Sequence, residues 1–254
     1  MIAIISPAKR LDFDNRVDFK ETEVRFQNET KSLIELLRQK SEKEVQSLMS
    51  LSDRLANLNL ERYQQFYTDD LPDHAKQALF AFQGDVYQGM QADTFDKSDV
   101  EYAQQHLRML SGLYGILRPL DMIQPYRLEM GTKLLINGHE SLYSFWGDKI
   151  AKALQKDLQE QGDNIIINLA SNEYFKAVET KAMDARIIDV DFKELKAGKY
   201  KIVAIYAKRA RGMMAHYMIK NKISNPEHLQ GFDYEGYTFH ESFSEDNKLV
   251  FTRG

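Results

Sequence analysis

Three groups of side chains in the sequence have types and spacings suited to binding or transforming an anion. The first is Ser6-Pro7-Ala8-Lys9, in which a lysine follows a serine by three residues, the spacing of a Ser-Lys acyl enzyme. No S-D-N or K-T-G motif accompanies it. We therefore interpret Ser6 and Pro7 as the start of a helical turn and Lys9 as a contact for an anion.

The second group is a basic segment, residues 195–225, which contains no acidic residue and carries +8. Subtracting this from the net charge of −4 leaves −12 for the rest of the chain. Its centre contains Lys208, Arg209 and Arg211, which we expect at a helix N-terminus directly after a strand. Cations there oppose the helix dipole, whereas the free amides bind anions. Two interpretations are open: a phosphate or carboxylate site, or a solvated stretch paired with acids elsewhere.

The third group lies in residues 104–130, where Arg108, Arg118 and Arg127 alternate with glycines and tyrosines. Arginine binds phosphate or carboxylate with two hydrogen bonds, glycine allows close backbone approach, and tyrosine stacks on bases. The alternative is a loop over the core in which Arg108 and Arg127 form structural ion pairs with acids such as Glu129.

A fourth pattern concerns the connection between two expected helices. A helix over 45–55 is followed by Ala56, Asn57, Leu58, Asn59 and Leu60 and then by a further helical stretch. A helix-hairpin-helix needs two positions that tolerate positive φ around one apolar residue, and asparagine is the most tolerant residue after glycine. A plain αα-hairpin is the commoner explanation of the same pattern.

The composition excludes several kinds of chemistry. The chain of 254 residues has no cysteine, which removes disulfides, thiol nucleophiles and cysteine metal sites. Its six histidines are dispersed without metal-ligand spacing, and no phosphate-binding or dinucleotide-binding glycine loop is present, so we expect neither a metal nor a cofactor. No segment is long enough to span a membrane and no signal peptide is evident, so we expect a cytoplasmic protein without a membrane partner.

The periodicity predicts an α+β fold, in which a mixed β-sheet is surrounded by helices and draws strands from both ends of the chain. With no linker or repeat, we expect a single domain over 1–254. The sequence defines neither strand order nor oligomeric state. The expected strands are 2–5, 164–169, 185–192, 200–207, 236–239 and 248–252. The expected helices include 45–55 with its capping box at Ser41, 70–84, 98–110, 141–161, 208–221 and short pieces near 171 and 226–229.

Several motifs together resemble the bacterial YaaA family of peroxide stress proteins over essentially the whole chain. They are Ser6-Pro7-Ala8-Lys9, Gly84-Asp85-Val86-Tyr87, the run 104–130, Phe145-Trp146-Gly147-Asp148, Asn168-Leu169-Ala170-Ser171 with Glu173-Tyr174, and Tyr206-Ala207-Lys208 with Ala210-Arg211-Gly212. The long central run is the most specific of them.

The resemblance implies a cytosolic protein of the peroxide response that limits unincorporated iron and so protects DNA and protein from oxidative damage. It further implies a fold particular to the family, a positively charged cleft, a helix-hairpin-helix, and binding to duplex, bubble and junction DNA that is largely independent of sequence. By position, the cleft cations would be Lys9, Arg108, Arg118, Arg127, Lys208 and Arg211, with Arg209 beside them, and the hairpin would be 56–60. The family leads us to expect glycine at position 57, where this chain has asparagine.

Two other functions stay open at this stage. One is an enzyme acting on a small phosphorylated or carboxylated metabolite, with Lys9, Arg127, Glu129 and Tyr174 in the same cleft; it requires an enclosed pocket, whereas a DNA-binding protein requires an open groove. The other is an iron-binding buffer. We expect no catalytic residues if the DNA-binding interpretation holds.

Overall fold

A mixed sheet organises the chain in the computed structural model, which describes residues 1–14, 17–69 and 71–254. The strand order is β11-β12-β9-β8-β1-β5-β6, with β10 paired to β9. Strands β1, β5, β8, β9 and β12 are parallel, whereas β6, β10 and β11 run antiparallel to their neighbours. The strands are β1 (Ile2–Ile5), β5 (Leu107–Ser111), β6 (Gly115–Leu117), β8 (Ile165–Leu169), β9 (Arg186–Lys196), β10 (Lys199–Lys201), β11 (Thr238–Phe239) and β12 (Lys248–Arg253). The predicted α+β class is therefore confirmed.

Strand β1 lies at the centre because all four of its residues are apolar and buried. It pairs with β5 through Ala3–Leu107 and with β8 through Ala3–Ile167. A parallel strand covered on both faces requires such a continuous apolar run, which explains why residues 2–5 were recognisable from sequence.

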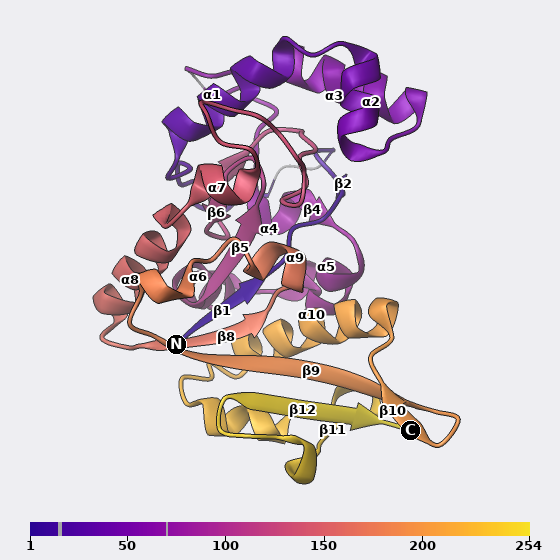
Figure 1. Ribbon diagram of the computed structural model, residues 1–254. Helices are drawn as coiled ribbons and strands as arrows, with labels where there is room; N and C mark the ends of the chain where they lie inside the picture. Colours follow the sequence, from indigo (N-terminus) through magenta and orange to yellow (C-terminus); the bar gives the residue numbers. More distant parts are fainter. Residues whose placement is uncertain (15–16, 70) are drawn as a thin grey trace.

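Helices lie at one end of the molecule and against the central part of this sheet (Figure 1). Helices α1, α2 and α3 lie at the end opposite strands β9 to β12, while α5, α6 and α10 pack together near β1, β8 and β9. The helices are α1 (Gln27–Arg38), α2 (Glu42–Met49), α3 (Asp53–Gln64), α4 (Ala78–Ala81), α5 (Asp85–Met90), α6 (Lys97–His106), α7 (Leu142–Trp146), α8 (Lys149–Gln161), α9 (Asn172–Phe175) and α10 (Ala204–Lys220). Short 3-10 turns cover Ala92–Thr94, Thr180–Ala182, Pro226–Gly231, Tyr234–Gly236 and Glu241–Phe243, and two-residue strands pair β2 (Arg10–Leu11) with β4 (Phe82–Gln83) and β3 (Lys76–Gln77) with β7 (Met122–Ile123).

The predicted hairpin at residues 56–60 is wrong. Ala56, Asn57, Leu58 and Asn59 all lie inside α3, and none of them has a positive φ. The turn between helices instead falls at Ser50, where φ is 51°, so α2 and α3 form a plain αα-hairpin. Ser41 caps α2 with the predicted capping box. The hairpin assignment failed because asparagine also fits a continuous helix: Asn57 is exposed on α3, and the buried Asn59 donates from its side chain to the Leu55 carbonyl.

Two predicted helices are shorter than expected. The helix over 98–110 is capped by Asp96 and ends at His106, after which Leu107–Ser111 becomes strand β5. The five residues of β5 are buried, and pairing with β1 replaces the helical hydrogen bonds. In the region 70–84 only Ala78–Ala81 is helical, between two short strands, and Asp70 lies outside the described residues.

The second half follows the prediction more closely. Strands β8, β9 and β12 occupy the expected segments. The predicted helix over 141–161 is divided at Gly147 into α7 and α8, and Gly162 closes α8 in a left-handed conformation with φ 67°. None of the helices in the described parts of the chain is long and apolar enough to cross a membrane.

The predicted strand over 200–207 is wrong beyond residue 201. Helix α10 begins at Ala204, so Lys208, Arg209 and Arg211 lie in its second and third turns rather than at its N-terminus. The amides of those residues are consequently hydrogen-bonded within the helix. The free amides on which the anion-site interpretation depended are therefore absent at these residues, and only their side chains are available to an anion.

Contact with α5 fixes the position of α10. A Cβ on Gly212 would lie 1.8 Å from the carbonyl oxygen of Val86, and one on Gly89 would lie 2.1 Å from that of Arg209. The two backbones therefore approach as closely as glycine allows. This close crossing holds Arg211, the neighbour of Gly212, beside the ends of the central strands.

Candidate functional site

The direction of winding in the sheet reverses between β1 and β8. Strand β1 leads to β5 on one side, whereas its other neighbour, β8, leads onward to β9. In open parallel sheets ligands bind in the crevice outside the carboxyl ends of the strands at such a reversal. A cavity of about 340 Å³ lies at this place, bordered by Ser6 and Pro7 after β1 and by Ser171 after β8.

The two strand ends are joined by hydrogen bonds. The amide of Ser171 donates to Ser6 Oγ at 2.9 Å, and the two hydroxyl oxygens are 3.3 Å apart. Tyr87 Oη donates to the carbonyl of Ser6 at 3.2 Å, and burial raises the pKa of the Tyr87 hydroxyl well above its ordinary value. Ser6 therefore connects the ends of β1 and β8 at the cavity. Lys9 forms an ion pair with Glu129 and not a hydrogen bond with Ser6.

Arg211 lines the cavity from α10 and has no partner for its buried Nε within the described chain. Burial lowers the pKa of this guanidinium, against the attraction of Asp191 and Asp189. Both acids are already engaged, because Lys248 Nζ lies 3.0 Å from Asp191 and Asn168 donates to Asp189 at 2.7 Å. A buried donor without a partner costs about 1–3 kcal/mol. The Nη atoms of Arg211 are not among the buried unpartnered atoms, so they are the donors that an anion in the cavity can reach.

Other cations surround the mouth of the cavity. Lys208 precedes Arg211 by three residues, which places both on one face of α10, and Lys208 and Arg10 are exposed at the rim. Neither has an ion pair among the residues that the structure describes. Two acids are also present, Asp85 and Glu173, and the second accepts a hydrogen bond from the Gly131 amide at 3.0 Å.

Lys9 and Arg127 share one carboxylate at the edge of this region. Glu129 lies 2.7 Å from Lys9 Nζ and 2.8 Å from Arg127 Nη2. Burial opposes ionisation of Glu129, but the hydrogen bonds from Lys9 and Arg127 outweigh it and lower the pKa of the carboxyl. Tyr63 on α3 donates to the Arg127 carbonyl, which connects the helical end of the molecule to this network. Lys9 remains 64% exposed, so it is the part of the network that an external anion can reach.

Two predicted cleft arginines do not reach the cavity. Arg108 is buried, and its Nε lies 2.7 Å from Asp157, which also binds Arg25 at 2.8 Å. Arg118 pairs with the buried Asp121 at 2.8 Å. Both therefore hold elements together, which was the alternative interpretation for Arg108, and their assignment to the cleft is corrected.

Arg209 and the predicted hairpin also lie elsewhere. Arg209 is next to Lys208 in sequence but forms an ion pair with Glu235 at 2.8 Å, outside the residues that line the cavity. Ala56 and Asn59 are buried in α3, and the Asn59 side chain donates to the Leu55 carbonyl. The structure thus brings together Lys9, Lys208 and Arg211 from the predicted set, with Arg127 behind Lys9.

Sequence reasoning did not assign Arg10, Tyr87 or Ser171 to a site, and all three line the cavity. Tyr174, expected in the cleft only for an enzyme, lines it as well. Burial raises the pKa of the Tyr174 hydroxyl, so this side chain is un-ionised at neutral pH. One signal was available: Ser6 and Ser171 each follow a buried strand, and parallel strands end at a common edge.

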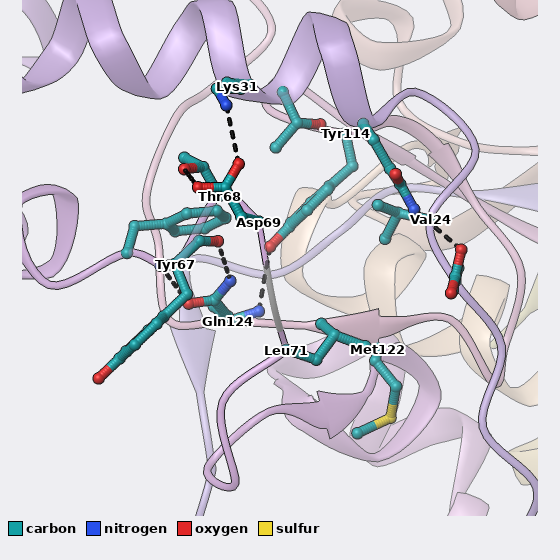
Figure 2. A pocket seen from close by; sticks show the side chains of 13 residues that line it. Val24, Lys31, Tyr67, Thr68, Asp69, Leu71, Tyr114, Met122 and Gln124 are labelled. Carbon is teal, nitrogen blue, oxygen red and sulfur yellow. Dashed lines mark hydrogen bonds and ion pairs between the residues drawn. The ribbon is translucent and has the colours of Figure 1, made fainter.

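A second cavity, of about 320 Å³, lies between α1 and the segment around Tyr67 (Figure 2). Its polar groups satisfy one another: Lys31 pairs with Asp69 at 2.8 Å, and Gln124 exchanges hydrogen bonds with the Tyr67 backbone at 2.8 and 2.9 Å. Tyr114 Oη accepts from the Gln124 amide. Because its polar groups are paired, this cavity is a weaker candidate than the one beside Arg211. Within the described ranges, no three His, Asp or Glu side chains group as a metal site would require.

Comparison with known proteins finds both a family model and full-length relatives. A family model described as peroxide stress protein YaaA matches residues 1–243. A UPF0246 protein of Alteromonas mediterranea is 50% identical over 254 residues, which is 100% of this chain and 98% of that relative.

Proposed function

Because the chain belongs to the YaaA family of peroxide stress proteins, we propose that it protects the cell under peroxide stress by binding DNA through the cationic mouth of the cavity at β1 and β8. Binding is to the phosphate backbone and therefore largely independent of sequence. The control of unincorporated iron that the family resemblance implies is part of the same proposal. The cytoplasm is the compartment in which we expect this function.

The observation that carries the proposal is the presence of Arg10 and Lys208 at one rim, exposed and without ion-pair partners in the described structure. Lys9 lies at the same rim and is exposed. A net charge of −4 disfavours general attraction to DNA, so binding requires a local concentration of cations such as this one. The support comes from the side chains of α10 and the segment after β1, and no longer from a helix-hairpin-helix.

The first prediction tests this surface with a double charge reversal, Arg10→Glu with Lys208→Glu. We expect duplex affinity, measured by fluorescence anisotropy at low salt, to fall by about tenfold or more. The plot of log affinity against log salt should become less steep by about 0.9 for each phosphate that the variant no longer neutralises.

The matched control is the double reversal Lys152→Glu with Lys156→Glu, which changes the same charge on the exposed face of α8. We expect it to retain most of the affinity and the original salt slope. Equal losses in the two double variants would contradict the proposal, because they would show a dependence on net charge alone.

An enzyme acting on a small phosphorylated or carboxylated metabolite is the second candidate. The cavity volume falls in the range of small-molecule pockets, and the unpartnered Arg211 favours an anionic ligand. However, three of the four residues proposed for its chemistry are paired with one another: Glu129 binds both Lys9 and Arg127, and only Tyr174 is outside these ion pairs. The geometry therefore supports binding of such a molecule more directly than its conversion.

A further inference from the structure

The guanidinium of Arg211 offers a directional site for one anionic group. Arginine has five N–H donors in a planar fork that matches the oxygens of a carboxylate or phosphate. Across the parts of the chain that are described, Arg211 forms no hydrogen bond or ion pair, and its Nε is inaccessible to solvent. The donors that a ligand in the cavity can reach are therefore the two Nη groups of Arg211, which have no partner in the described chain.

Asp191 and Asp189 attract the Arg211 guanidinium, but neither forms an ion pair with it in the described chain. Asp191 is held by Lys248, and Asp189 accepts from Asn168. In the cavity wall, Glu173 accepts from the Gly131 amide, and Asp85 has no ion pair with Arg211. No carboxylate among the described residues contacts the guanidinium, so its accessible donors are open to an anion from outside the chain.

The other residues that line the cavity indicate what kind of ligand fits it. Apolar atoms of Pro7, Ala8, Val86 and Leu169 line the same cavity as Arg211. A volume of about 340 Å³ suits a small molecule. B-DNA, whose major groove alone is about 12 Å wide, is too broad to enter it. The ligand that fits has one anionic end and an apolar body.

We infer that this cavity is a binding pocket for a free small molecule that carries a phosphate or carboxylate on an apolar body, with Arg211 holding the anionic group. The recessed pocket would bind the small molecule, whereas the exposed rim of the cavity is the part proposed to contact DNA. It does not depend on that proposal, because Arg211 is recessed while Arg10 and Lys208 are at the surface.

The test uses phenyl phosphate and benzoate as probes of the two anion types, with benzyl alcohol as the uncharged analogue. Isothermal titration calorimetry should detect at least one anionic probe and not the alcohol. In ¹H–¹⁵N spectra the Arg211 Nε–Hε signal should shift on binding. The variant Arg211→Met should weaken that binding by about tenfold or more, because it removes the charge-assisted hydrogen bonds.

Arg209→Met is the matched control, since Arg209 lies on the same helix and pairs with Glu235 outside the cavity. It should bind the probe as the unmodified protein does. Arg211→Met should keep its melting temperature, because it removes an unpartnered charge, and should keep duplex DNA affinity, so that the two proposals can fail separately.

Three results would overturn the inference: no binding of either anionic probe up to about 10 mM, equal binding by Arg211→Met, or an unchanged Arg211 Nε–Hε signal at saturation.

Discussion

Arg108 and Arg211 illustrate how the partner, and not the residue type, decides the role of a side chain. Both are arginines in motifs of the same family, and both are largely removed from solvent. Arg108 is neutralised by Asp157, whereas Arg211 faces a cavity without an ion pair in the described structure. The first therefore stabilises the fold, and the second is available to a ligand.

Asp157→Asn is the prediction at this scale. The substitution leaves Arg108 fully buried, and Arg25 mostly buried, without a counterion. Breaking such a buried pair costs about 3–5 kcal/mol in the free energy of unfolding, which urea denaturation measures. Glu160→Gln, at an exposed site on the same helix, should change it by less than about 0.5 kcal/mol. A cost as small for Asp157→Asn would refute the structural role of Arg108.

At the scale of elements, tertiary contacts override local propensity in two places. Residues 202–206 are rich in β-branched and aromatic side chains, which favour a strand. From Ala204 onward the chain is nevertheless helical, because α10 packs against α5 with backbone contacts at Gly212 and Gly89 that only a helix in this position makes. In Leu107–Ser111 the opposite change occurs: the sequence predicts a continuation of the helix, but this apolar run pairs with β1 as a strand.

The ends of α6 and α10 are linked by a single carboxylate, which leads to a prediction about pH. Asp99 near the start of α6 binds Lys220 at 2.6 Å and also Lys222. Burial opposes ionisation of Asp99, but the hydrogen bonds from both lysines lower its pKa from 3.8 to about 2. Because the folded pKa is the lower one, this stabilisation is present above pH 3.8 and is lost as the pH falls toward 2.

We therefore expect Asp99→Asn to lower the free energy of unfolding at pH 7 by about 1 kcal/mol, a modest value because the lysine side chains are 35% and 37% exposed. The difference from the unmodified protein should shrink below pH 3.8 and disappear only below about pH 2. Glu101→Gln, on the exposed part of the same helix, is the control. A difference between Asp99→Asn and the unmodified protein that is independent of pH would contradict the explanation. Chemical denaturation at a series of pH values measures this difference in the free energy of unfolding.

At the scale of the whole molecule, the sheet ties together segments from both ends of the chain. Strand β1 is at its centre, and β12 joins it through β9 and β8. We predict that residues 1–254 unfold as one cooperative domain. Fluorescence of Trp146, the single tryptophan, and far-UV circular dichroism should give the same urea midpoint. Separate midpoints for the two signals would show independent domains.

The cations of the basic segment, which are close together in the sequence, lie in different parts of the folded molecule. Lys220 and Lys222 neutralise Asp99, and Arg209 pairs with Glu235. Lys208 and Arg211 alone of the eight cations line the cavity. A charge of +8 in the sequence therefore becomes, after folding, a small cationic site beside several structural ion pairs.

The sequence by itself determined the α+β class, the central and later strands, the capping box at Ser41 and the closing glycine of α8. These features depend on local periodicity and on residues that favour one backbone conformation. Its motifs also determined the family. The absence of cysteine was sufficient, without the fold, to exclude thiol chemistry.

Only the tertiary structure decided that the strand order reverses between β1 and β8, that α10 begins at Ala204, and that residues 56–60 are helical. The tertiary structure also showed that Arg211 lines the cavity, whereas Arg108, Arg118 and Arg209 form ion pairs elsewhere. The physical reason is that a cation's role depends on which carboxylates lie within about 4 Å of it, and those come from segments distant in sequence. Composition shows that cations are present, but the packing of the chain determines which of them remain free for a ligand.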